Sequence, residues 1–390
     1  LKGYSDKVEI LRGGDTETIH TTDPFAELKK LLGRSDDQSY RYLGGAVGVV
    51  NYDAIRLVED IPDTHNSPQP LMEFGIYDDG ILYDNLHKKL FYFYHDENRF
   101  DKLKMSGDTF GDFHSSEVTP NMDKEKFSDI VNKAKKLIYD GDIFQVVLSR
   151  KFAFENNGDN LTLYKTLRKL NPSPYMYHLK QGSKTIIGAS PEMLVRITDD
   201  KVETFPIAGT RKITDNEEKN KQLADELLHD EKELAEHTML VDLGRNDIGR
   251  VCKYGTVHPE SLMQIKRFSH VQHIVTHVVG KLAPNNDMFD AFKAVFPAGT
   301  VSGAPKVRAM EIIDELETGA RGPYAGAVGY FSFNGCCDFA IAIRSIFIDG
   351  KRGFVQSGAG IVADSVPEHE FKEIEFKAGA MLQALKEATK

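Results

Sequence analysis

Short runs of alternating hydrophobic and polar residues dominate the chain from residue 1 to about residue 105. The runs Gly44–Tyr52, Gly75–Tyr83 and Lys89–Tyr94 have the period of two that strands show, and the last two predict a hairpin or meander. A helix is predicted to interrupt these strands at about Pro24–Leu32. The front of the chain is therefore expected to be mainly β-structure.

A polar stretch without periodicity, Ser106–Met122, follows this region. It is rich in Gly and Ser, so we predict a linker there, between an N-terminal region at residues 1–105 and a second domain at residues 123–390. Beyond the linker, apolar residues recur at helical spacing as far as Tyr139, and a strand-like run occupies Asp142–Phe152. The second domain is thus predicted to begin with a helix and a strand.

The remainder of the chain mixes strand and helix patterns without an internal repeat. Strands are predicted at Gly326–Ser332 and Phe339–Ile348, and helices at about 216–246, 287–296, 304–317 and 366–388. The predicted fold class is mixed α/β, of the α+β type, with a substantial content of antiparallel sheet.

Composition narrows the class of protein. The chain has 390 residues, of which 41% are hydrophobic and 28% are charged, values typical of a folded globular protein. Its formal net charge is −10, which argues against non-specific binding to nucleic acid because such binding requires a basic face. An acidic protein that binds an anionic substrate must gather positive charge locally, from Arg, Lys or a metal ion.

Hydropathy and cysteine usage both bear on the compartment. No apolar run approaches the length that crosses a bilayer, and the N-terminus lacks the pattern of a signal peptide. Cys252, Cys336 and Cys337 have neither metal-ligand spacing nor the pattern of a disulfide framework. We therefore expect a cytoplasmic protein.

Two predicted helices carry pairs of glutamates at a spacing of three. Glu233 and Glu236 form the first pair; Glu370 and Glu373 form the second, with Lys377 four residues further on. Residues three or four apart share one face of a helix, and the two pairs together would supply the oxygen ligands that Mg²⁺ prefers. Glutamates at this spacing are also common on solvent-exposed helices, and periodicity does not show that the two helices meet.

Glycine-rich segments supply a second candidate site. Ser357–Ile361 follows a strand-like run at Arg352–Gln356, and Phe296–Lys306 leads into a predicted helix. Glycines let the backbone approach a ligand, and successive N–H groups or a helix N-terminus can bind an anion. Ordinary turns are the alternative interpretation of either segment.

His273 lies in a segment of aliphatic and β-branched residues, where a histidine is more often packed in a core than catalytic. His258, His270 and His277 are near it in the sequence and raise the question of zinc. They lack cysteine or carboxylate partners at the usual spacing, so we do not predict a zinc site.

Long distinctive segments occur in one order along the chain. They are SPEMLV at 190–195, PIAGTRK at 206–212, KELAEHTMLVDLGRNDIGRV at 232–251, SHVQHIVTHVVG around His273, FPAGTVSGAPKVRAMEII at 296–313, RGPYAGAVGYF at 321–331, AIAIRS at 340–345 and VQSGAGIVADSVPEHE at 355–370. From about residue 120 to the C-terminus the chain thus resembles the chorismate-utilising enzymes, and the front third fits their less distinctive N-terminal region. This resemblance implies two intertwined subdomains with antiparallel β-sheets sandwiched between helices.

The resemblance also implies a metal site and a substrate site. In that family two glutamate pairs hold Mg²⁺, which engages the ring carboxylate of chorismate; the corresponding residues are Glu233, Glu236, Glu370 and Glu373. Tyr324, Arg344 and the backbone of Gly358, Ala359 and Gly360 correspond to residues that bind the second carboxylate, and Lys377, Thr300, Ala208, Gly209 and Thr210 to further substrate contacts. Arginine suits a planar carboxylate because its two N–H arms can bond it bidentately.

Two residues resemble the family's proton-transfer groups. Glu192 is similar to the general acid that protonates the departing C4 hydroxyl when ammonia attacks C2, a role that needs a raised pKa. His273 is similar to the residue that removes the C2 proton as pyruvate leaves, and imidazole suits proton transfer near neutral pH.

Two further positions favour one reaction within the family. Gln145 stands where the water-adding members carry a Lys base, and Ala208 stands where aminodeoxychorismate synthases carry a nucleophilic Lys. The expected reaction is therefore amination at C2 with loss of pyruvate, which gives anthranilate in the first committed step of tryptophan biosynthesis. An aminodeoxyisochorismate synthase, which stops before pyruvate leaves, is the alternative. An aminodeoxychorismate synthase, or a non-catalytic relative that binds chorismate or tryptophan, is less expected.

A half-site for inhibition by L-tryptophan is implied by the segment Asn171, Pro172, Ser173, Pro174, Tyr175 and Met176. A proline-rich turn that enters a strand is the alternative. The family's other half-site, an LLES-type motif, does not occur before Tyr4, so we expect the N-terminal region to be truncated at its front. The sequence therefore does not decide whether tryptophan inhibits this chain.

Ammonia requires a source. Glutamine amidotransferase domains use a Cys nucleophile on a sharp Gly-flanked turn, and none of the three cysteines has that context. We therefore expect a separate glutaminase subunit and a hetero-oligomer.

Overall fold

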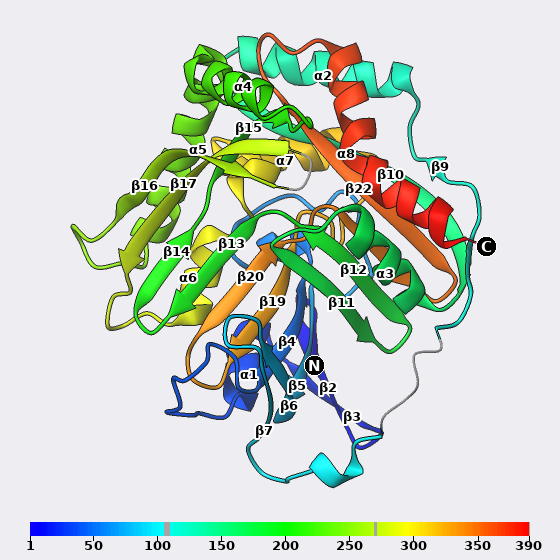
Figure 1. Ribbon diagram of the computed structural model, residues 1–390, viewed down its shortest axis with the longest axis vertical. Coiled ribbons are helices and arrows are strands. Elements are labelled where there is room, and N and C mark those ends of the chain that lie inside the picture. Colours follow the sequence, from blue (N-terminus) through cyan, green and yellow to red (C-terminus); the bar gives the residue numbers. More distant parts are fainter. Residues whose placement is uncertain (105–109, 269–270, 390) are drawn as a thin grey trace.

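Two antiparallel β-sheets form the centre of the chain (Figure 1), whose computed structural model describes residues 1–104, 110–268 and 271–389. The larger sheet has 12 strands within these residues. In spatial order they are β15 (Ile207–Lys212), β17 (Val271–Lys281), β14 (Lys201–Thr204), β13 (Met193–Thr198), β20 (Cys337–Ile341), β19 (Ala327–Ser332), β4 (Gly45–Val50), β5 (Met72–Tyr77), β1 (Lys2–Gly3), β2 (Lys7–Arg12) and β3 (Asp15–His20), with β16 (His258–Arg267) paired to β17. The predicted N-terminal strands therefore continue the same sheet as strands from the rest of the chain.

The smaller sheet has eight strands within the described residues. Its order is β11 (Tyr175–Gln181), β12 (Lys184–Ser190), β21 (Ser345–Asp349), β22 (Arg352–Ile361), β10 (Gln145–Gly158) and β18 (Gly303–Ala304), with β8 (Phe113–Ser115) and β9 (Thr119–Pro120) paired to β10. A separate hairpin consists of β6 (Asp79–Asp84) and β7 (Lys89–Tyr94). The chain passes from β12 to β13 and from β20 to β21, so the two sheets are intertwined.

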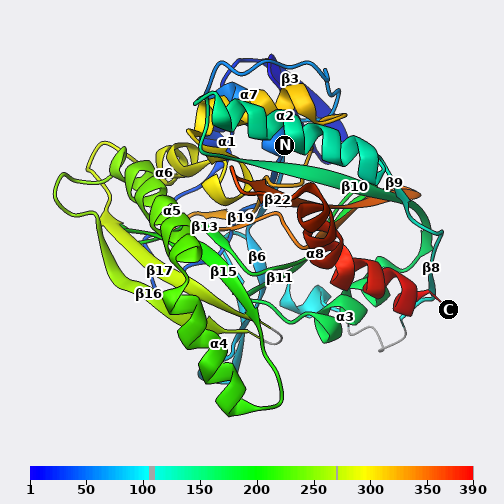
Figure 2. The same ribbon diagram turned by 90° about the horizontal axis from the view of Figure 1, so that it is seen from above.

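Helices pack against both sheets. They are α1 (Pro24–Leu31), α2 (Lys124–Tyr139), α3 (Asn160–Leu170), α4 (Glu217–His229), α5 (Glu231–Gly249), α6 (Met288–Val295), α7 (Lys306–Leu316) and α8 (Pro367–Ala388), with short 3-10 helices η1 (Tyr52–Leu57), η2 (Phe100–Lys102) and η3 (Gly299–Val301). Helices α4 and α5 contact β15 and β17, whereas α8 contacts β22, α2 and α3 (Figure 2). The predicted class, mixed α/β with antiparallel sheets and helices, is confirmed.

Periodicity located the helices well where one face is apolar and a cap fixes the start. The predicted helix that ends at Tyr139 is α2, which buries Phe127 and Val131, and its N-cap Asp123 accepts a hydrogen bond from the backbone N–H of Lys126. The C-terminal helix α8 likewise matches its predicted range. No helix among the described residues is long and apolar enough to cross a membrane.

The predicted helix at about 216–246 is wrong as a single element. The structure has two helices, α4 and α5, which meet at Asp230. Asp230 is extended, and its side chain accepts hydrogen bonds from the backbone N–H groups of Lys232 and Glu233, so it caps a new helix. Glu233 therefore lies in the first turn of α5 and not in the middle of one long helix.

The predicted strand Phe339–Ile348 is also two elements. Strand β20 ends at Ile341 in the larger sheet, and β21 begins at Ser345 in the smaller sheet. Arg344, between them, has a φ of 51°, which few non-glycine residues adopt. The chain turns sharply there because it changes sheet.

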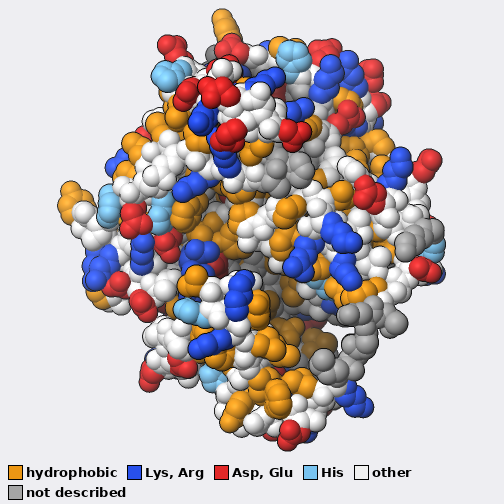
Figure 3. Space-filling view, viewed as in Figure 1, with side chains coloured by type: hydrophobic (Ala, Val, Ile, Leu, Met, Phe, Trp, Pro, Cys, Tyr) orange, Lys and Arg blue, Asp and Glu red, His pale blue; other side chains and the backbone are white. Residues whose placement is uncertain are grey.

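The expected glycine-rich loop at Ser357–Ile361 is wrong, because those residues complete β22 and pair with β10. The predicted strand Gly75–Tyr83 is likewise divided between β5 and β6, and only β6 forms the hairpin with β7. Hydrophobic side chains gather over this hairpin at the lower end of Figure 3; Ile81, Tyr83, Leu86 and Leu90 are exposed there. Residues 105–109, which include the start of the predicted linker, lie outside the described residues.

Candidate active site

A cavity of about 540 Å³ lies where β10, β15, β17 and β22 face α5 and α8. Most of the residues predicted from the sequence line it. They are Gln145, Glu192, Ala208, Gly209, Thr210, Glu233, Glu236, His273, Thr300, Tyr324, Arg344, Gly358, Gly360, Glu370, Glu373 and Lys377. The structure thus brings together residues that are up to 232 positions apart, from Gln145 to Lys377.

Ala359 is an exception among the predicted substrate contacts. Its side chain is completely buried and does not line the cavity, since successive residues of β22 point to opposite faces of the sheet. Gly358 and Gly360 do face the cavity, and their lack of a side chain has a steric reason. A Cβ at Gly358 would lie 2.8 Å from the Tyr324 hydroxyl, and one at Gly360 would lie 2.5 Å from Nε2 of Gln145.

The turn between the sheets places Arg344 in the cavity wall. Its guanidinium donates a 2.9 Å hydrogen bond to the backbone carbonyl of Lys377, which ties it to α8. Burial lowers the pKa of Arg344, but an arginine remains charged in proteins at physiological pH. Arg344 and the Lys377 ammonium supply the local positive charge that an acidic protein needs in order to bind an anion.

Glu192 is buried, with 7% of its surface exposed. Its Oε1 accepts a 2.9 Å hydrogen bond from the Thr300 hydroxyl. Burial raises the pKa of Glu192 to about 8, and the hydrogen bond from Thr300 and the charge of Lys377 only partly oppose that effect. The carboxyl group is therefore protonated at neutral pH and can act as an acid.

His273 extends from β17 into the cavity beside Phe268, whose ring centroid is 5.3 Å away. Its Nδ1 lies 2.7 Å from the carbonyl oxygen of Gly209, an oxygen that can only accept, so Nδ1 carries the hydrogen. Nε2 is then left with a free lone pair. Burial and the nearby Arg344 and Lys377 lower the pKa of His273, so the ring is neutral near neutral pH and can accept a proton.

The four predicted metal ligands face the same cavity from α5 and α8, but they are not drawn together around one point. Glu233 pairs with Arg211 at 3.0 Å and Glu373 pairs with Lys377 at 2.6 Å. Within residues 1–104, 110–268 and 271–389, no three His, Cys, Asp or Glu side chains are grouped closely enough to hold a metal ion.

The chemistry of this donor set nevertheless fits a divalent cation that takes oxygen ligands. Burial first, and the neighbouring carboxylates next, raise the pKa of both Glu236 and Glu370. A cation would relieve that repulsion. Gln145 belongs to this group as well, because its Nε2 donates to Glu236 over 3.2 Å, while its Oε1 has no hydrogen-bond partner in the described part of the chain.

The sequence reasoning missed several residues in and around the cavity, and two of them belong to its polar network. Gln356 lines the cavity and donates a 2.8 Å hydrogen bond to the Ser149 hydroxyl. Arg211, next to the cavity, joins Asp230 and Glu233 through contacts of 2.9 and 3.0 Å. Both residues lie in segments that carry the family resemblance, Arg211 in PIAGTRK and Gln356 in VQSGAGIVADSVPEHE, so their presence there was the available signal.

The predicted tryptophan half-site lies elsewhere. None of its six residues lines the 540 Å³ cavity. Tyr175 begins β11 there, and its hydroxyl donates a 2.7 Å hydrogen bond to Asp338, which also binds Arg196 at 2.8 Å. The role of this segment in inhibition stays a prediction.

Comparison with known proteins assigns the class. The profile of the family described as chorismate binding enzyme matches residues 3–383, and the chain belongs to this family. Relatives named Anthranilate synthase component 1 are similar to it: the protein of Methanothermobacter marburgensis is 48% identical over 391 residues, covering 100% of this chain and 84% of the relative. The protein of Saccharolobus solfataricus is 45% identical over 387 residues, covering 99% of this chain and 87% of the relative.

The fold agrees with a solved structure of the same name. Anthranilate synthase component I from Streptococcus pneumoniae TIGR4 superposes with a TM-score of 0.84 at 38% identity, covering 98% of this chain and 91% of that chain. The resemblance to the chorismate-utilising enzymes that the sequence motifs predicted is therefore confirmed over nearly the whole chain.

Proposed function

We propose that this chain converts chorismate to anthranilate by Mg²⁺-dependent amination at C2 and elimination of pyruvate. One observation carries the proposal: a buried carboxyl, Glu192, and a neutral imidazole, His273, line the same cavity as the Arg344 guanidinium and four glutamates. An acid, a base and local positive charge for a dicarboxylate are thus present in one place. The names of the relatives at 41–48% identity support the same reaction.

Substrate orientation follows from the two ends of the cavity. Arg344 and the Tyr324 hydroxyl bind the carboxylate of the enolpyruvyl arm, because Arg344 is charged and Tyr324 is held neutral by burial, which raises its pKa. At the other end, Glu233, Glu236, Glu370 and Glu373 would hold Mg²⁺, which supplies positive charge for the ring carboxylate when bound. The ring is thereby fixed between its two carboxylates.

Glu192 gives its proton to the C4 hydroxyl as ammonia forms a bond to C2. A hydroxide is a poor leaving group, so protonation is needed, and the raised pKa of Glu192 keeps its proton available at neutral pH. Thr300 holds the carboxyl in one orientation through the hydrogen bond to Oε1. His273 then takes the C2 proton through Nε2 as the bond to the enolpyruvyl oxygen breaks, which makes the ring aromatic.

Gln145 and Ala208 exclude competing nucleophiles. A carboxamide cannot deprotonate water, and the Oε1 of Gln145, which has no partner among the described residues, is an acceptor suited to an N–H of ammonia. Ala208, 8% exposed in the cavity wall, has no group that could attack the ring. An aminodeoxyisochorismate synthase, which shares the amination, is the second candidate; the orientation of His273 toward the cavity favours completion of the elimination.

Ammonia comes from a partner component in this proposal. The relatives are named as component 1, which implies a further component. We propose a glutaminase subunit for that role. The amination of chorismate and the elimination of pyruvate take place in the cavity of this chain.

The test is an incubation with chorismate, Mg²⁺ and an ammonium salt at alkaline pH without any glutaminase, in which anthranilate fluorescence and pyruvate are followed. Equal amounts of both products support the proposal. An amino product without pyruvate contradicts it in favour of the aminodeoxyisochorismate reaction. No turnover, even after a glutaminase component is added, contradicts both.

A further inference from the structure

A second, smaller cavity of about 40 Å³ adjoins the active site. Glu192, Leu240 and Thr300 line both cavities, so these three residues separate them. The remaining walls are mainly apolar and come from α5, the end of α6, η3 and the strands β13, β14 and β20, for example Leu243 and Val295. One other carboxyl group, that of Asp247, faces this space.

The proposed reaction requires that Glu192 be reprotonated after each turnover. When the C4–O bond breaks, the oxygen keeps the bonding electrons and takes the proton of Glu192, so water leaves and Glu192 becomes a carboxylate. The new C2–N bond leaves one surplus proton on nitrogen, which is released, and the overall proton count balances. Glu192 must nevertheless regain a proton before each further turnover, although it is almost fully buried.

The smaller cavity is large enough to hold water. A single water needs roughly 10–15 Å³ of such space and two to four polar partners. The carboxyl groups of Glu192 and Asp247 and the hydroxyl groups of Thr204 and Thr300 are the polar side-chain groups that offer these partners. A buried water here would lie between the two carboxyl groups.

Asp247 lines the smaller cavity and is also partly exposed. Its side chain is 11% exposed, and the Lys306 ammonium donates to its Oδ2 over 2.6 Å. Lys306 also donates to the carbonyl oxygen of Val295 over 3.2 Å, so its position is fixed from the start of α7. Asp247 thus keeps one edge toward solvent while it faces the cavity.

We propose that Glu192 is reprotonated through the smaller cavity, by water that connects it to Asp247. The Asp247 carboxylate takes up a proton from solvent and passes it to a cavity water, which gives a proton to the Glu192 carboxylate, so that Asp247 ends the step as the carboxylate paired with Lys306. Asp247 is a positioning residue in this scheme because it acts through water and does not touch the substrate. The proposal rests on the proposed role of Glu192 as the acid.

The first test is the time course of anthranilate formation by Asp247→Asn at neutral pH, after rapid mixing with chorismate, Mg²⁺ and ammonium. Glu192 is protonated at the start, so the first anthranilate per active site should form at the wild-type rate. Later turnovers should then slow by about tenfold or more, which gives a burst of one equivalent. Asp242→Asn is the matched control, because Asp242 is on the same helix and its side chain is 65% exposed; it should show no burst.

A second variant reduces the space for water in the smaller cavity without changing any charge. A Cβ at Gly244 would stand 3.3 Å from Cγ of Pro206 in the cavity wall, so Gly244→Ala reduces the space and improves the helix. It should show the same burst, whereas Gly249→Ala, with nothing within 4 Å of its Cβ, should not.

Added formate, a small carboxylate that can replace the missing Asp247 side chain, should restore the later turnovers of Asp247→Asn. Equal slowing of the first and later turnovers in both cavity variants would mean a structural role and would overturn the inference. Wild-type rates throughout would place the proton's route in the larger cavity and overturn it as well. Absence of anthranilate from the wild-type chain supplemented with its glutaminase component would instead overturn the proposed function.

Discussion

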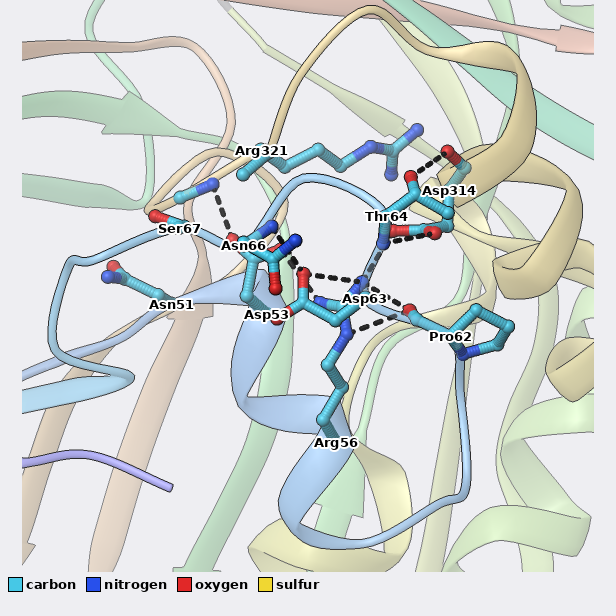
Figure 4. A network of polar contacts seen from close by, with 12 residues as sticks. Asn51, Asp53, Arg56, Pro62, Asp63, Thr64, Asn66, Ser67, Asp314 and Arg321 are labelled. Carbon is cyan, nitrogen blue, oxygen red and sulfur yellow. Dashed lines mark hydrogen bonds and ion pairs between the residues drawn. The ribbon is translucent and has the colours of Figure 1, made fainter. Parts of the chain in front are cut away.

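Two clusters of buried charge in this chain differ in how their charges are balanced. In the first, Arg56 of η1 donates to Asp53 at 3.0 Å, to Asp314 of α7 at 2.5 Å and to the carbonyl of Pro62 at 2.9 Å (Figure 4). The backbone N–H of Thr64 completes the set by donating to Asp314 over 3.1 Å. Each aspartate of this cluster has both an ion pair with Arg56 and a backbone N–H donor, because Asp53 also accepts from Gly322 over 2.8 Å, and the cluster fastens a segment of the N-terminal region to α7.

The second cluster is the active-site cavity, where only Glu233 and Glu373 of the five glutamates have an ion-pair partner among the described residues. Glu192 has Thr300 as its hydrogen-bond donor and no ion-pair partner among the described residues. Burial, and next to it the charge of neighbouring carboxylates, raises the pKa of both Glu236 and Glu370. Buried carboxyls without matched charge reduce stability, and such groups are typical of sites that bind a cation or transfer a proton.

The contrast therefore separates charge that holds the fold together from charge that is kept for chemistry. Substitutions in the Arg56 cluster should reduce the free energy of unfolding and have little effect on the activity of the folded molecules. Substitutions in the cavity should reduce activity and have little effect on the free energy of unfolding.

The largest effect is expected from Glu192→Gln. Loss of the acid should reduce kcat by roughly 10²–10⁴-fold, since the C4 hydroxyl leaves unprotonated. The measurement is kcat at a fixed concentration of free ammonia, so that titration of ammonium does not distort the comparison. A variant that retains wild-type kcat would show that Glu192 is not the acid.

The same substitution has a predicted signature in stability. Burial raises the pKa of Glu192 from 4.5 to about 8, so the folded state binds more protons than the unfolded state between these values. The free energy of unfolding of the wild type should therefore decrease as the pH rises through that window. Glu192→Gln should show a smaller decrease in denaturant titrations over the same range; an identical pH dependence would contradict the assignment.

His273→Met is expected to change the product. Amination does not need the imidazole, so chorismate should still be consumed, while pyruvate release should fall by roughly 10²-fold or more. Chromatography of the reaction would show an amino product that retains the enolpyruvyl arm. Unchanged anthranilate output would refute the role of His273, and His277→Met, on the same strand, is the control.

Arg56→Met should destabilise the chain by about 2–4 kcal/mol, because it leaves the buried Asp53 and Asp314 without an ion-pair partner. Denaturant unfolding measures this loss, and kcat per folded molecule should not change. Arg99→Met is the control: Arg99 also binds two aspartates, but its side chain is 42% exposed, so a much smaller loss of stability is expected. Equal losses in the two variants would remove the distinction between the clusters.

Glu373→Gln should have the smallest effect. Removing one carboxylate should raise the Mg²⁺ concentration for half-maximal activity by about tenfold, while saturating Mg²⁺ restores part of the rate. Glu387→Gln, an exposed position on the same helix, should leave the Mg²⁺ dependence unchanged. If both variants respond to Mg²⁺ as the wild type does, Glu373 is not a ligand.

Local signals explain which elements were predicted correctly. Helices α2 and α8 each have an apolar stripe that survives in any tertiary context, so their ranges were found from periodicity. The break at Asp230 had a local signal as well, an aspartate three residues before Glu233, which is a typical start of a helix. That signal was overlooked because the pattern on either side is also helical.

Other features had no local signal. Residues Phe339–Ile348 are uniformly apolar and β-prone apart from Arg344 and Ser345, and the break among them exists because the two halves pair in different sheets. The glycines of β22 indicate a loop when the sequence is considered alone. In the structure they belong to a strand, because Tyr324 and Gln145 occupy the space that side chains at Gly358 and Gly360 would need.

The sequence by itself determined the family, the identity of the candidate acid, base and carboxylates, and the type of most helices, because these depend on residue chemistry and on local periodicity. Only the tertiary structure decided that α5 and α8 face one cavity, that Arg344 turns into it, and that Asp247 lies across a second space from Glu192. These relations depend on contacts between residues far apart in the chain. They are fixed by how two intertwined sheets pack, and no short segment carries that information.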